Sequence, residues 1–345
     1  MIRIAILGAG EIAERHVEGL QRARGVRLVS VCDPLTERAN ALALSAGFDR
    51  VDADADDAIA ADDIDLVLVL TPHDLHAPQV VAALEAGKHV VCEKPMGRTV
   101  AECDAMLEAA ARTGRQLFVT HVLRTMFFFA RAHERVDAGA LGRLTLGSFR
   151  WYTDELSRLD DPTHWKGTRD VSGGGVLIDG GCHACDVGNW LFGPARRVQA
   201  LADRLVATRE AVGEDTAVFQ VEYESGALAS YSMSFVAGSG LRPRRFACGM
   251  DVDLYGTEGH IEGGYRFRDE EHRHYLTEHR GGEEDRVHPV DSAGVYGDID
   301  VAIIEALRGE RQTPVTPIEA RNAVAVVEAA YRSLESGTSV DVDWR

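Results

Sequence analysis

The sequence predicts two domains: an α/β domain with a doubly wound parallel sheet over residues 1–121, and an α+β domain with an open, largely antiparallel sheet over residues 122–345. A chain of 345 residues exceeds the usual size of a single core, since most domains have about 100–200 residues. Apolar runs and amphipathic segments alternate up to about residue 120, which is typical of a parallel sheet covered by helices. From residue 144 onward most segments are strand-like and separated by turn residues, which indicates antiparallel pairing.

The chain begins with a strand, a glycine-rich turn and a helix. The apolar run Ile2–Leu7 leads into Gly8-Ala9-Gly10-Glu11-Ile12-Ala13, and the helix continues to about Arg24. Gly8 permits a tight turn, Gly10 lets a pyrophosphate approach the backbone, and Ala13 allows close packing of the helix on the strand. The helix N-terminus then faces the phosphates. This pattern predicts a Rossmann-type dinucleotide site; the alternative is a glycine turn in an α/β domain that binds no dinucleotide.

The second strand, Leu28–Cys32, ends in Asp33. A carboxylate at this place accepts a hydrogen bond from the 2′-hydroxyl of the adenosine ribose and repels the additional phosphate of NADP. Arg38, on the predicted helix Thr36–Ala46, is the close candidate for binding that phosphate. The sequence therefore predicts NAD as the cofactor in preference to NADP.

The next strand–helix–strand unit has polar residues after each of its strands. The strands Leu66–Leu70 and His89–Cys92 flank a helix predicted over Ala77–Ala86. Thr71-Pro72 follows the first strand, and Glu93-Lys94-Pro95 follows the second. Ligands bind at the carboxyl ends of parallel strands, so the lysine of this run is predicted to lie where chemistry takes place.

The rest of the chain is assigned by the same patterns. A helix over Thr99–Arg112 and a strand over Gln116–Thr120 complete the first domain. Residues 125–138 are predicted to be helical, and a final helix over Ile318–Ser336 begins after Thr316-Pro317. The strands predicted for the second domain are Leu144–Tyr152, Val198–Leu205, Ala217–Tyr223, Ala227–Phe235 and Met250–Tyr255.

A helix between these strands carries an acid and an imidazole at helical spacing. If it begins near Asp179, then Asp179, His183 and Asp186 lie at i, i+4 and i+7 on one face. Imidazole titrates near neutral pH, so His183 can take a proton from a hydroxyl, while Asp179 orients the ring or the substrate. The alternative is a structural histidine capped by an aspartate.

Some clusters resemble metal sites but lack firm ligand spacing. Asp52–Asp65 begins like a calcium loop, yet its sixth and twelfth positions are Asp57 and Asp63 instead of glycine and glutamate, which favours a solvated helix face. Cys182 and Cys185 have no second pair in the sequence and are interpreted as core-facing thiols. No metal is predicted. A polar stretch, interpreted as a solvated hairpin, contains the incidental histidines His272, His274, His279 and His288.

Composition argues against several classes of partner. The formal net charge is −18, from 37 basic and 55 acidic residues, whereas a nucleic-acid surface requires clustered Lys and Arg. No apolar run approaches the roughly 20 residues of a membrane-spanning helix, and the first residues lack the charged leader of a signal peptide. The six cysteines lie in apolar or helical contexts, which suggests reduced thiols. We therefore expect a cytoplasmic protein that binds neither nucleic acid nor membranes.

Together these motifs resemble the Gfo/Idh/MocA oxidoreductases over nearly the full length of the chain. The combination of Glu-Lys-Pro with a later Asp-x-x-x-His is specific, and it favours the acid/base interpretation of His183. The resemblance implies a Rossmann domain, a second domain whose open sheet often forms the oligomer interface, and NAD(P)-dependent chemistry on sugars, inositols and related polyols. The motifs that carry it are Gly8–Ala13 with His16, Cys32-Asp33-Pro34, Thr71-Pro72 with His76, Glu93-Lys94-Pro95, and Gly173-Gly174-Gly175 with Asp179 and His183.

The resemblance also implies which residues form the site. The sequence departs from the family at His73, where asparagine is common, and at Gly180, where a larger apolar residue is usual. The implied catalytic set is Lys94, Asp179 and His183. These residues, with His121, Arg124, Trp165 and Lys166, are expected to contact the substrate. The implied cofactor-binding set is Gly8, Ala9, Gly10, Glu11, Ile12, Asp33, Arg38, Thr71, Pro72, His76, Glu93 and Lys94. Within it, Gly8, Gly10 and Ile12 are implied at the pyrophosphate, Asp33 at the adenosine ribose, and Thr71, Pro72, His76 and Glu93 at the nicotinamide half.

The predicted reaction is hydride transfer between a secondary alcohol of a sugar, inositol or related polyol and nicotinamide. Such an oxidation needs a base for the hydroxyl proton and a cation that stabilises negative charge on oxygen, which are the expected roles of His183 and Lys94. Two alternatives stay open: an enzyme with tightly bound cofactor that cleaves a glycosidic bond by transient oxidation and elimination, and a non-catalytic cofactor-sensing protein. A homodimer or homotetramer is predicted, because the second sheet has too few helices to cover both faces.

Overall fold

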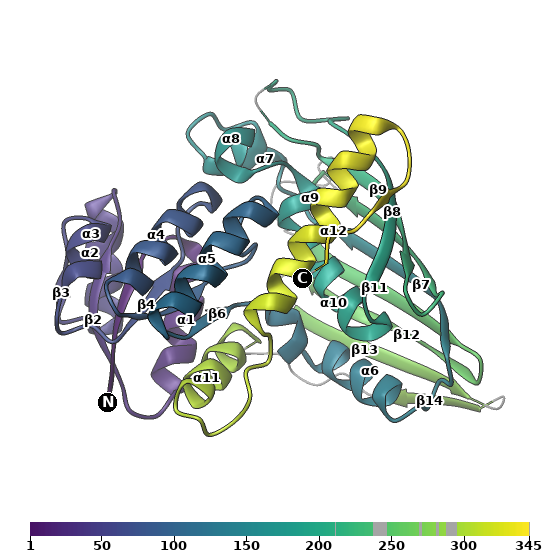
Figure 1. The fold of residues 1–345 in the computed structure, drawn as a ribbon, viewed down its shortest axis with the longest axis horizontal. Helices are drawn as coiled ribbons and strands as arrows, with labels where there is room; N and C mark the ends of the chain where they lie inside the picture. Colours follow the sequence, from purple (N-terminus) through teal and green to yellow (C-terminus); the bar gives the residue numbers. More distant parts are fainter. Residues whose placement is uncertain (211, 237–246, 269–270, 281–282, 288–294, 345) are drawn as a thin grey trace. The chain divides into compact units, whose positions relative to one another are not determined.

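The computed structural model describes residues 1–345 except 211, 237–246, 269–270, 281–282, 288–294 and 345 (Figure 1). The chain forms two compact units. The first consists of Met1–Val122 with Gly294–Arg321, and the second of Leu123–Ala293 with Asn322–Arg345. The sequence analysis places one boundary at residues 121–122 and leaves the whole remaining chain in the second domain. In the structure a segment from the last quarter of the chain instead packs with the first unit.

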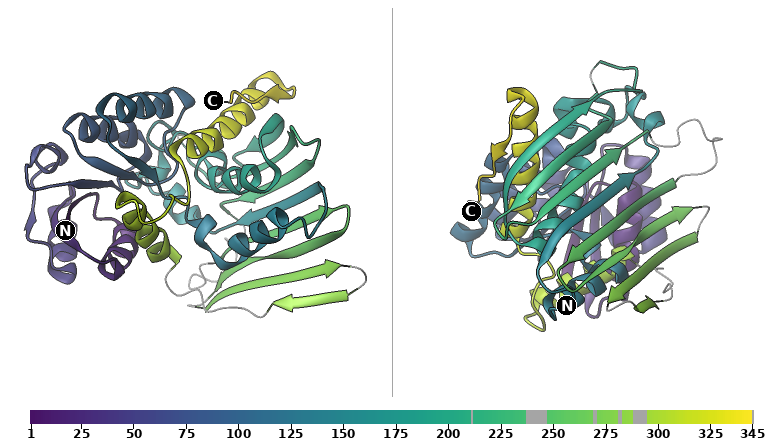
Figure 2. Two further views of the ribbon diagram at one scale, coloured as in Figure 1. Left: turned by 60° about the horizontal axis from the view of Figure 1, so that its bottom comes forward. Right: turned by 90° about the vertical axis from the view of Figure 1, so that its right-hand side faces the viewer.

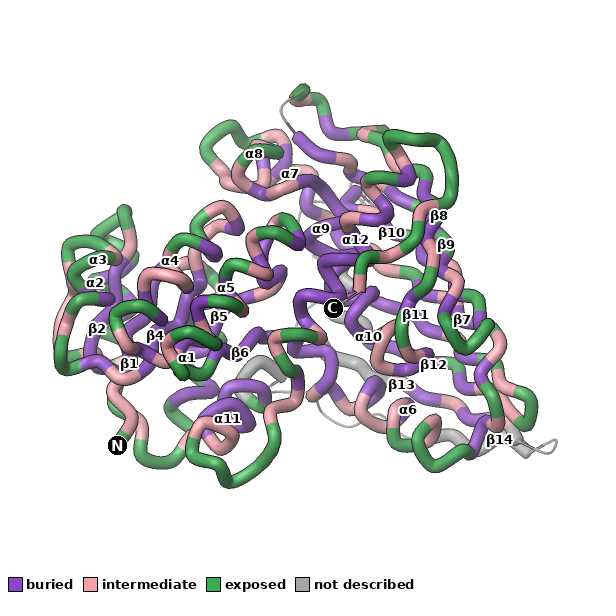
Figure 3. The backbone as a smooth tube through the Cα atoms, viewed as in Figure 1, coloured by how far each residue is buried: buried purple, intermediate pink, exposed green. Residues whose placement is uncertain are grey.

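The first unit is built on a parallel sheet. Its strands are β1 (Ile2–Leu7), β2 (Val26–Cys32), β3 (Arg50–Val51), β4 (Leu66–Val69), β5 (His89–Cys92) and β6 (Leu117–Val119), in the order β3-β2-β1-β4-β5-β6. All neighbouring pairs are parallel. The central strands β1, β4 and β5 are buried over most of their length, which explains their continuous apolar sequences (Figure 3). The strand order reverses direction between β1 and β4, where such sheets bind ligands.

Helices connect these strands and end at local signals. They are α1 (Glu11–Arg22), α2 (Thr36–Ala46), α3 (Ala55–Ala60), α4 (His73–Glu85) and α5 (Val100–Thr113), to which the chain later adds α11 (Val295–Leu307). At the start of α5 the Thr99 hydroxyl accepts a hydrogen bond from the backbone N–H of Glu102, and Gly114, with a φ of 66°, follows its end. The sequence analysis does not predict α11, which packs against α1.

The second unit is built on a nine-stranded sheet in the order β14-β13-β12-β11-β7-β10-β9-β8-β15. Only β7 and β10 pair in parallel among its described neighbours, so the sheet is largely antiparallel, as predicted (Figure 2). The polar stretch interpreted as a hairpin, residues 266–286, contains the end of β12, β13 and most of β14, and β13 pairs antiparallel with both of the others. The strands are β7 (Leu144–Tyr152), β8 (Ala195–Asp203), β9 (Thr216–Tyr223), β10 (Leu228–Ser234), β11 (Ala247–Gly256), β12 (Gly259–Arg268), β13 (Glu271–Arg280), β14 (Glu283–Val287) and β15 (Val340–Asp341).

One face of this sheet forms the core of the second unit. On β10, Ala229, Tyr231 and Met233 are buried, whereas the serines that alternate with them are half-buried or exposed. The ring of Tyr231 stacks between Phe149 and Phe219 of the neighbouring strands, with centroid distances of 4.6 and 4.5 Å. The buried face is covered by α6 (Phe127–Asp137), α9 (Val176–Asp179) and α10 (Gly181–Phe192). Figure 3 shows α10 buried along most of its length.

The remaining helices are shorter, apart from the long α12. They are η1 (Val122–Thr125), α7 (Leu156–Leu159), η2 (Trp165–Gly167), α8 (Arg169–Ser172) and α12 (Pro317–Ser336). Ser333 of α12 accepts a hydrogen bond from the backbone N–H of Ala200 on β8, at 3.0 Å. In the part of the chain that the structure describes, no helix combines the length and apolar character needed to cross a membrane.

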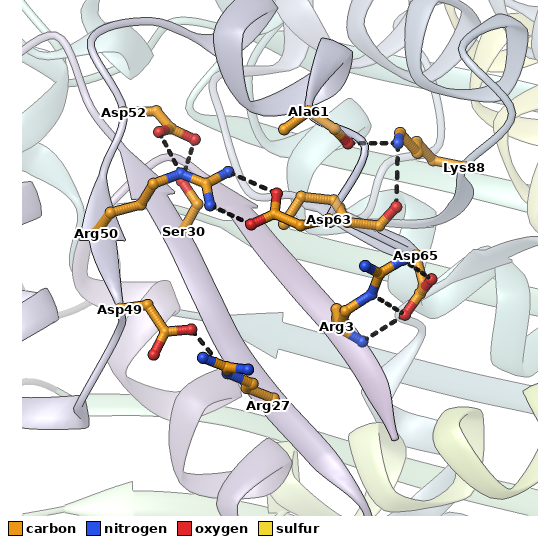
Figure 4. A network of polar contacts seen from close by, with 11 residues as sticks. Arg3, Arg27, Ser30, Asp49, Arg50, Asp52, Ala61, Asp63, Asp65 and Lys88 are labelled. Carbon is orange, nitrogen blue, oxygen red and sulfur yellow. Dashed lines mark hydrogen bonds and ion pairs between the residues drawn. The ribbon is translucent and has the colours of Figure 1, made fainter.

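The acidic stretch Asp52–Asp65 surrounds α3 and is engaged in local contacts (Figure 4). Arg50 donates to Asp52 and Asp63, and Arg3 donates to Asp65. Asp54 caps α3, since its carboxylate accepts the backbone N–H of Asp57 at 3.0 Å. No group of three ligating side chains suited to a metal gathers among the described residues. These aspartates therefore serve ion pairs and a helix cap.

Candidate functional site

The glycine-rich turn joins β1 to α1. Gly8 has a φ of 96°, and a Cβ atom there would lie 2.7 Å from the carbonyl oxygen of Leu70, so both the conformation and the close packing require glycine. At Gly10 a Cβ atom would meet nothing within 4 Å, which leaves the backbone open to an approaching ligand. Gly10 is also the N-cap of α1 and forms no side-chain cap. An open turn at a helix N-terminus fits the pyrophosphate of a dinucleotide.

Asp33 follows β2, and backbone groups fix its carboxylate. One oxygen accepts the N–H of Ala9 in the glycine-rich turn and the other accepts the N–H of Leu35, each at 2.8 Å. Carboxylate oxygens have further lone pairs, so Asp33 can also accept hydrogen bonds from ribose hydroxyls. Arg38 is exposed on α2. The carboxylate thus lies beside the turn that fits the phosphates, as the adenosine half of a dinucleotide requires.

His76 links the loops that follow β4 and β5. α4 begins at His73, one turn before the predicted start at Ala77, and Pro78 lies within the helix without ending it. His76 therefore lies in the first turn, where its Nδ1 is 2.9 Å from the carbonyl oxygen of Pro95 and its Nε2 is 2.9 Å from that of Thr71. Burial lowers the pKa of His76, so the neutral ring donates to one carbonyl at a time.

Glu93 fixes the backbone at Lys94. It is buried, and one carboxylate oxygen accepts hydrogen bonds from the Thr120 hydroxyl at 2.6 Å and from His16 Nε2 at 3.2 Å. The other oxygen accepts the backbone N–H of Lys94 at 2.9 Å. Burial acts to raise the pKa of Glu93, but His16 and then Lys94 outweigh it and bring the pKa below its usual value. An ionised Glu93 therefore anchors the end of β5.

His16 is itself held between two carboxylates. Its Nδ1 lies 2.9 and 3.1 Å from the two carboxylate oxygens of Asp300 on α11, opposite the contact to Glu93. Burial acts to lower the pKa of His16, but Asp300 and Glu93 raise it to about 10. Sequence reasoning missed Asp300. The available signal was a charged residue between Ile299 and Val301 in an apolar segment, which indicates a buried partner.

The predicted catalytic helix of the second unit is divided. Asp179 is the last residue of α9, Gly180 follows, and α10 begins at Gly181, close to the predicted start, with His183 in its first turn. The backbone at Gly180 keeps helical angles, with φ −80° and ψ −40°. A Cβ atom on Gly180 would lie 3.2 Å from the carbonyl oxygen of Val176 and 3.3 Å from Met233, tighter than ordinary contact. A larger residue at this position would require Met233 of β10 to shift.

Asp179 is paired with Lys166. The Lys166 Nζ atom lies 2.7 Å from Asp179 Oδ2 and 3.3 Å from Glu155 Oε2, and the side chains are 14%, 10% and 7% exposed. The same ammonium group lies over the rings of Trp165 and Phe235, 5.5 and 5.3 Å from their centroids. The sequence analysis places Trp165 and Lys166 in a substrate-lining region but does not predict that Lys166 pairs with Asp179.

His183 stacks on an aromatic ring of the sheet. Its imidazole lies 5.3 Å from the Trp151 ring on β7, with 15° between the planes, and the residue is 5% exposed. Such stacking limits rotation of the imidazole. The orientation of the predicted base is therefore set by β7 as well as by α10.

Arg124 and Asp186 form a buried ion pair. Arg124 Nε and Nη2 donate to the two oxygens of Asp186 at 2.9 and 2.6 Å, and the side chains are 3% and 1% exposed. The sequence analysis places Asp186 on one face with His183, whereas its carboxylate is bound by Arg124 in the structure. The predicted contact of Arg124 with substrate stays a prediction. His121, also predicted near the substrate, follows β6 and is fully buried in the first unit.

The three-glycine run before α9 packs against Glu214. One oxygen of Glu214 accepts the backbone N–H groups of Gly175 and Leu177, each at 3.0 Å, and the Tyr331 hydroxyl at 2.8 Å. Burial raises the pKa of Glu214. A Cβ atom on Gly174 would collide with the Tyr331 hydroxyl, and one on Gly175 with the backbone of Glu214. This packing holds the start of the helix that ends in Asp179.

Two further clusters are weighed in the sequence, a pair of cysteines and a group of histidines. Cys182 and Cys185 are buried on α10, as interpreted, and burial raises the pKa of the Cys185 thiol well above its usual range. His279 stacks on His260 with 4.1 Å between ring centroids. His288 and the side chains of His272 and His274 lie outside the described residues.

Comparison with known proteins identifies two family domains. Residues 2–121 match the family described as oxidoreductase, NAD-binding Rossmann fold, and residues 133–342 match its C-terminal alpha/beta domain. The chain is 28% identical over 355 residues to a 1,5-anhydro-D-fructose reductase of Ensifer adhaerens, covering 99% of both chains. It is 28% identical over 274 residues to scyllo-inositol 2-dehydrogenase (NAD(+)) of Bacillus subtilis, covering 75% of this chain and 73% of that one.

A solved structure supports the same assignment. GenD2 from gentamicin A biosynthesis, in complex with NAD, is 26% identical with a TM-score of 0.81, covering 99% of this chain and 96% of that one. The glycine-rich turn, the carboxylate after β2 and the two-domain architecture agree with these matches. The chain belongs to the Gfo/Idh/MocA family of NAD(P)-dependent oxidoreductases.

Proposed function

We propose that this protein transfers hydride between a secondary alcohol of a sugar, inositol or related polyol and the nicotinamide of NAD. The observation that carries the proposal lies within the first unit. The glycine-rich turn, Asp33 and Lys94 follow β1, β2 and β5 of one parallel sheet, so all three lie at its carboxyl edge. The bound nicotinamide supplies the hydride donor or acceptor. The anhydrofructose reductase and inositol dehydrogenase among its relatives support a carbohydrate or polyol substrate.

The residues of the chain supply proton transfer and charge stabilisation. In the oxidative direction His183 takes the hydroxyl proton, and Lys94 stabilises the negative charge that develops on the oxygen. Asp179, paired with Lys166, accepts hydrogen bonds that orient the substrate. In the reductive direction the same groups act in reverse, with His183 returning the proton to the oxygen.

The preference for NAD rests on Asp33. Its carboxylate is fixed by two backbone N–H groups, so it cannot turn away from a neighbouring phosphate without losing both hydrogen bonds. The 2′-phosphate of NADP would meet this negative charge, whereas the 2′-hydroxyl of NAD can donate to it. Arg38 on α2 is the residue that would reduce the preference for NAD over NADP, because its guanidinium could bind the 2′-phosphate.

A substrate screen tests the proposal. Purified protein is offered aldoses, inositols, uronates and anhydrosugars with NAD, and formation of NADH is followed by absorbance. We expect saturable NADH formation with members of one of these classes. Cleavage of a glycoside without net NADH formation, together with bound cofactor recovered from the purified protein, would instead identify transient oxidation and elimination. Binding of NAD without turnover of any compound, glycosides included, would contradict the proposal.

A further inference from the structure

A continuous chain of buried polar contacts runs from α11 to the backbone of Lys94. Asp300 of α11 holds His16 Nδ1 at 2.9 Å, and His16 Nε2 contacts Glu93 at 3.2 Å. The second oxygen of Glu93 accepts the backbone N–H of Lys94 at 2.9 Å. The side chains of His16, Glu93 and Asp300 are 0%, 8% and 2% exposed. These contacts are therefore hardly screened by water.

The charges of Asp300, His16 and Glu93 depend on one another. An imidazolium at His16 faces a carboxylate on each side, and both of its N–H groups are used. Without Asp300, His16 retains Glu93 as its partner but loses the contact that fixes the far side of its ring. A neutral His16 could still donate one N–H group to Glu93, but the contact would lose its positive charge and weaken.

The backbone is fixed on both sides of Lys94. Glu93 accepts the backbone N–H of Lys94 itself, and His76 contacts the carbonyl oxygen of the next residue, Pro95. Thr120, which directly follows β6, also donates to Glu93. The position and the direction of the Lys94 side chain therefore depend on the contacts that hold the carboxylate of Glu93 in place.

We propose that Asp300 is a positioning residue for Lys94 that acts through His16 and Glu93. The inference rests on the proposed function, which assigns to Lys94 the stabilisation of charge on the substrate oxygen. If Asp300 has this role, α11 contributes to the activity of the first unit, although it lies far along the chain from the nucleotide-binding motifs.

The kinetic test compares two substitutions on the same helix. Asp300→Asn removes the buried charge, and Asp298→Asn removes an exposed charge that pairs with Arg22, with side chains 57% and 46% exposed. Asp300→Asn should lower kcat by about 10- to 100-fold, as expected for a misplaced catalytic group, while KM for NAD changes little. Asp298→Asn should keep kcat within about twofold. Wild-type kcat in a folded Asp300→Asn variant would overturn the proposal.

A second comparison asks whether the effect passes through Lys94. In a Lys94→Met background, Asp300→Asn should change kcat by less than about twofold, because the group it positions is already absent. The same loss in both backgrounds would mean that Asp300 acts elsewhere. If Asp300→Asn fails to fold, Asp300→Glu keeps the charge and should show a smaller loss of kcat that also disappears in the Lys94→Met background.

Two measurements need no substrate and separate this inference from the proposed function. The chain has only three lysines, Lys88, Lys94 and Lys166, so labelling by trinitrobenzenesulfonate can be followed at each by mass spectrometry. The labelling rate of Lys94 should change severalfold in Asp300→Asn and not in Asp298→Asn, with Lys88, which donates to the carbonyls of Ala61 and Ile64, as internal reference.

The second of these measurements is the NMR titration of His16, assigned with a His16→Asn variant. In the wild-type protein its ring should titrate near pH 10, and the midpoint should fall in Asp300→Asn. If no sugar is oxidised, the proposed function fails, but the labelling rate of Lys94 and the titration of His16 still test whether Asp300 positions Lys94. An unchanged Lys94 labelling rate with an unchanged His16 titration would overturn the inference alone.

Discussion

The Nζ atom of Lys166 lies 2.7 Å from Asp179, so the acid of the predicted catalytic pair is held by a lysine that comes 13 residues earlier in the chain. Glu155 shares the same ammonium group at 3.3 Å. Two carboxylates that are at most 10% exposed therefore share this cation, and Glu155 also contacts Arg158 at 3.1 Å. Loss of Lys166 would leave Asp179 without this counter-ion in a poorly solvated place.

Lys166→Met should therefore impair both stability and turnover. Breaking a buried ion pair by removing one partner costs up to about 3–5 kcal/mol, which denaturant unfolding can measure. Turnover should fall at least about tenfold, because a protonated Asp179 cannot accept the hydrogen bonds that orient the substrate. Arg158→Met is the matched control: it removes the partly exposed cation from Glu155 and keeps Lys166 on Asp179. Equal effects of the two substitutions would show that the pairing with Asp179 has no special role.

Asp33→Ala should narrow the preference for NAD over NADP. The substitution removes the repulsion of the 2′-phosphate together with the acceptor for the ribose hydroxyl, so kcat/KM should fall with NAD and rise or hold with NADP. Steady-state kinetics with both cofactors provide the measurement, and Asp49→Ala, an exposed aspartate that pairs with Arg27, is the control. A wild-type protein that prefers NADP by about tenfold would contradict the assignment of Asp33.

The stability of the first unit should decrease at alkaline pH because of His16. Its pKa is raised from 6.5 to about 10 in the folded protein. A raised pKa means that the folded state binds the proton more tightly, so this stabilisation is complete below about pH 6.5 and is lost as the pH rises through about 10. Between these values His16 alone should lower the free energy of unfolding by up to about 1.4 kcal/mol per pH unit. Denaturant unfolding of the wild type and of His16→Asn should differ in slope over this window, and parallel curves would contradict the buried ion pair.

We propose that the outer face of the nine-stranded sheet forms a homodimer or homotetramer interface. Leu228, Leu146 and Tyr255 are neighbours in register on β10, β7 and β11, and they are 55%, 47% and 40% exposed. Such a row on a sheet face is typical of an interaction surface. Light scattering should give a dimer or tetramer for the wild type and a smaller species for Leu146→Glu. Leu44→Glu, at an 88% exposed position on α2, should leave the assembly unchanged. A monomeric wild-type protein at micromolar concentration would contradict the proposal.

Local patterns were sufficient to predict most of the fold. Continuous apolar runs such as Leu66–Val69 and His89–Cys92 identified buried parallel strands, and alternation in Leu228–Ser234 identified a sheet with one buried face. The helix over Thr36–Ala46 and the strand over Leu144–Tyr152 have the predicted bounds. These elements are determined by neighbouring residues, which is why periodicity finds them.

The errors concern features that depend on distant residues. The sequence predicts a single helix, whereas the structure divides it into α9, which ends at Asp179, and α10, which begins at Gly181; Gly180 between them lies close to Met233 of β10. Likewise, Asp186 is bound by Arg124 and Asp179 by Lys166, although helical spacing alone places both acids near His183. The partners of buried charges are chosen by tertiary packing, so sequence reasoning can predict that a partner exists but not which one.

The same limit applies to α11. Its partner α1 lies almost the whole chain away. Only the structure pairs Asp300 with His16. The motif residues His16 and Glu93 were found by resemblance, but the contact between them and its extension to α11 were not.

The measurement that tests the central claim most directly is turnover of His183→Ala and Lys94→Met on a sugar or polyol that the wild type oxidises. If His183 accepts the proton and Lys94 stabilises the charge on the same oxygen, each substitution should lower kcat by about 10²- to 10⁴-fold with NADH affinity little changed. The double variant should lose much less than the product of the two factors. Nearly full turnover by His183→Ala would show that the histidine is only structural and would contradict the account.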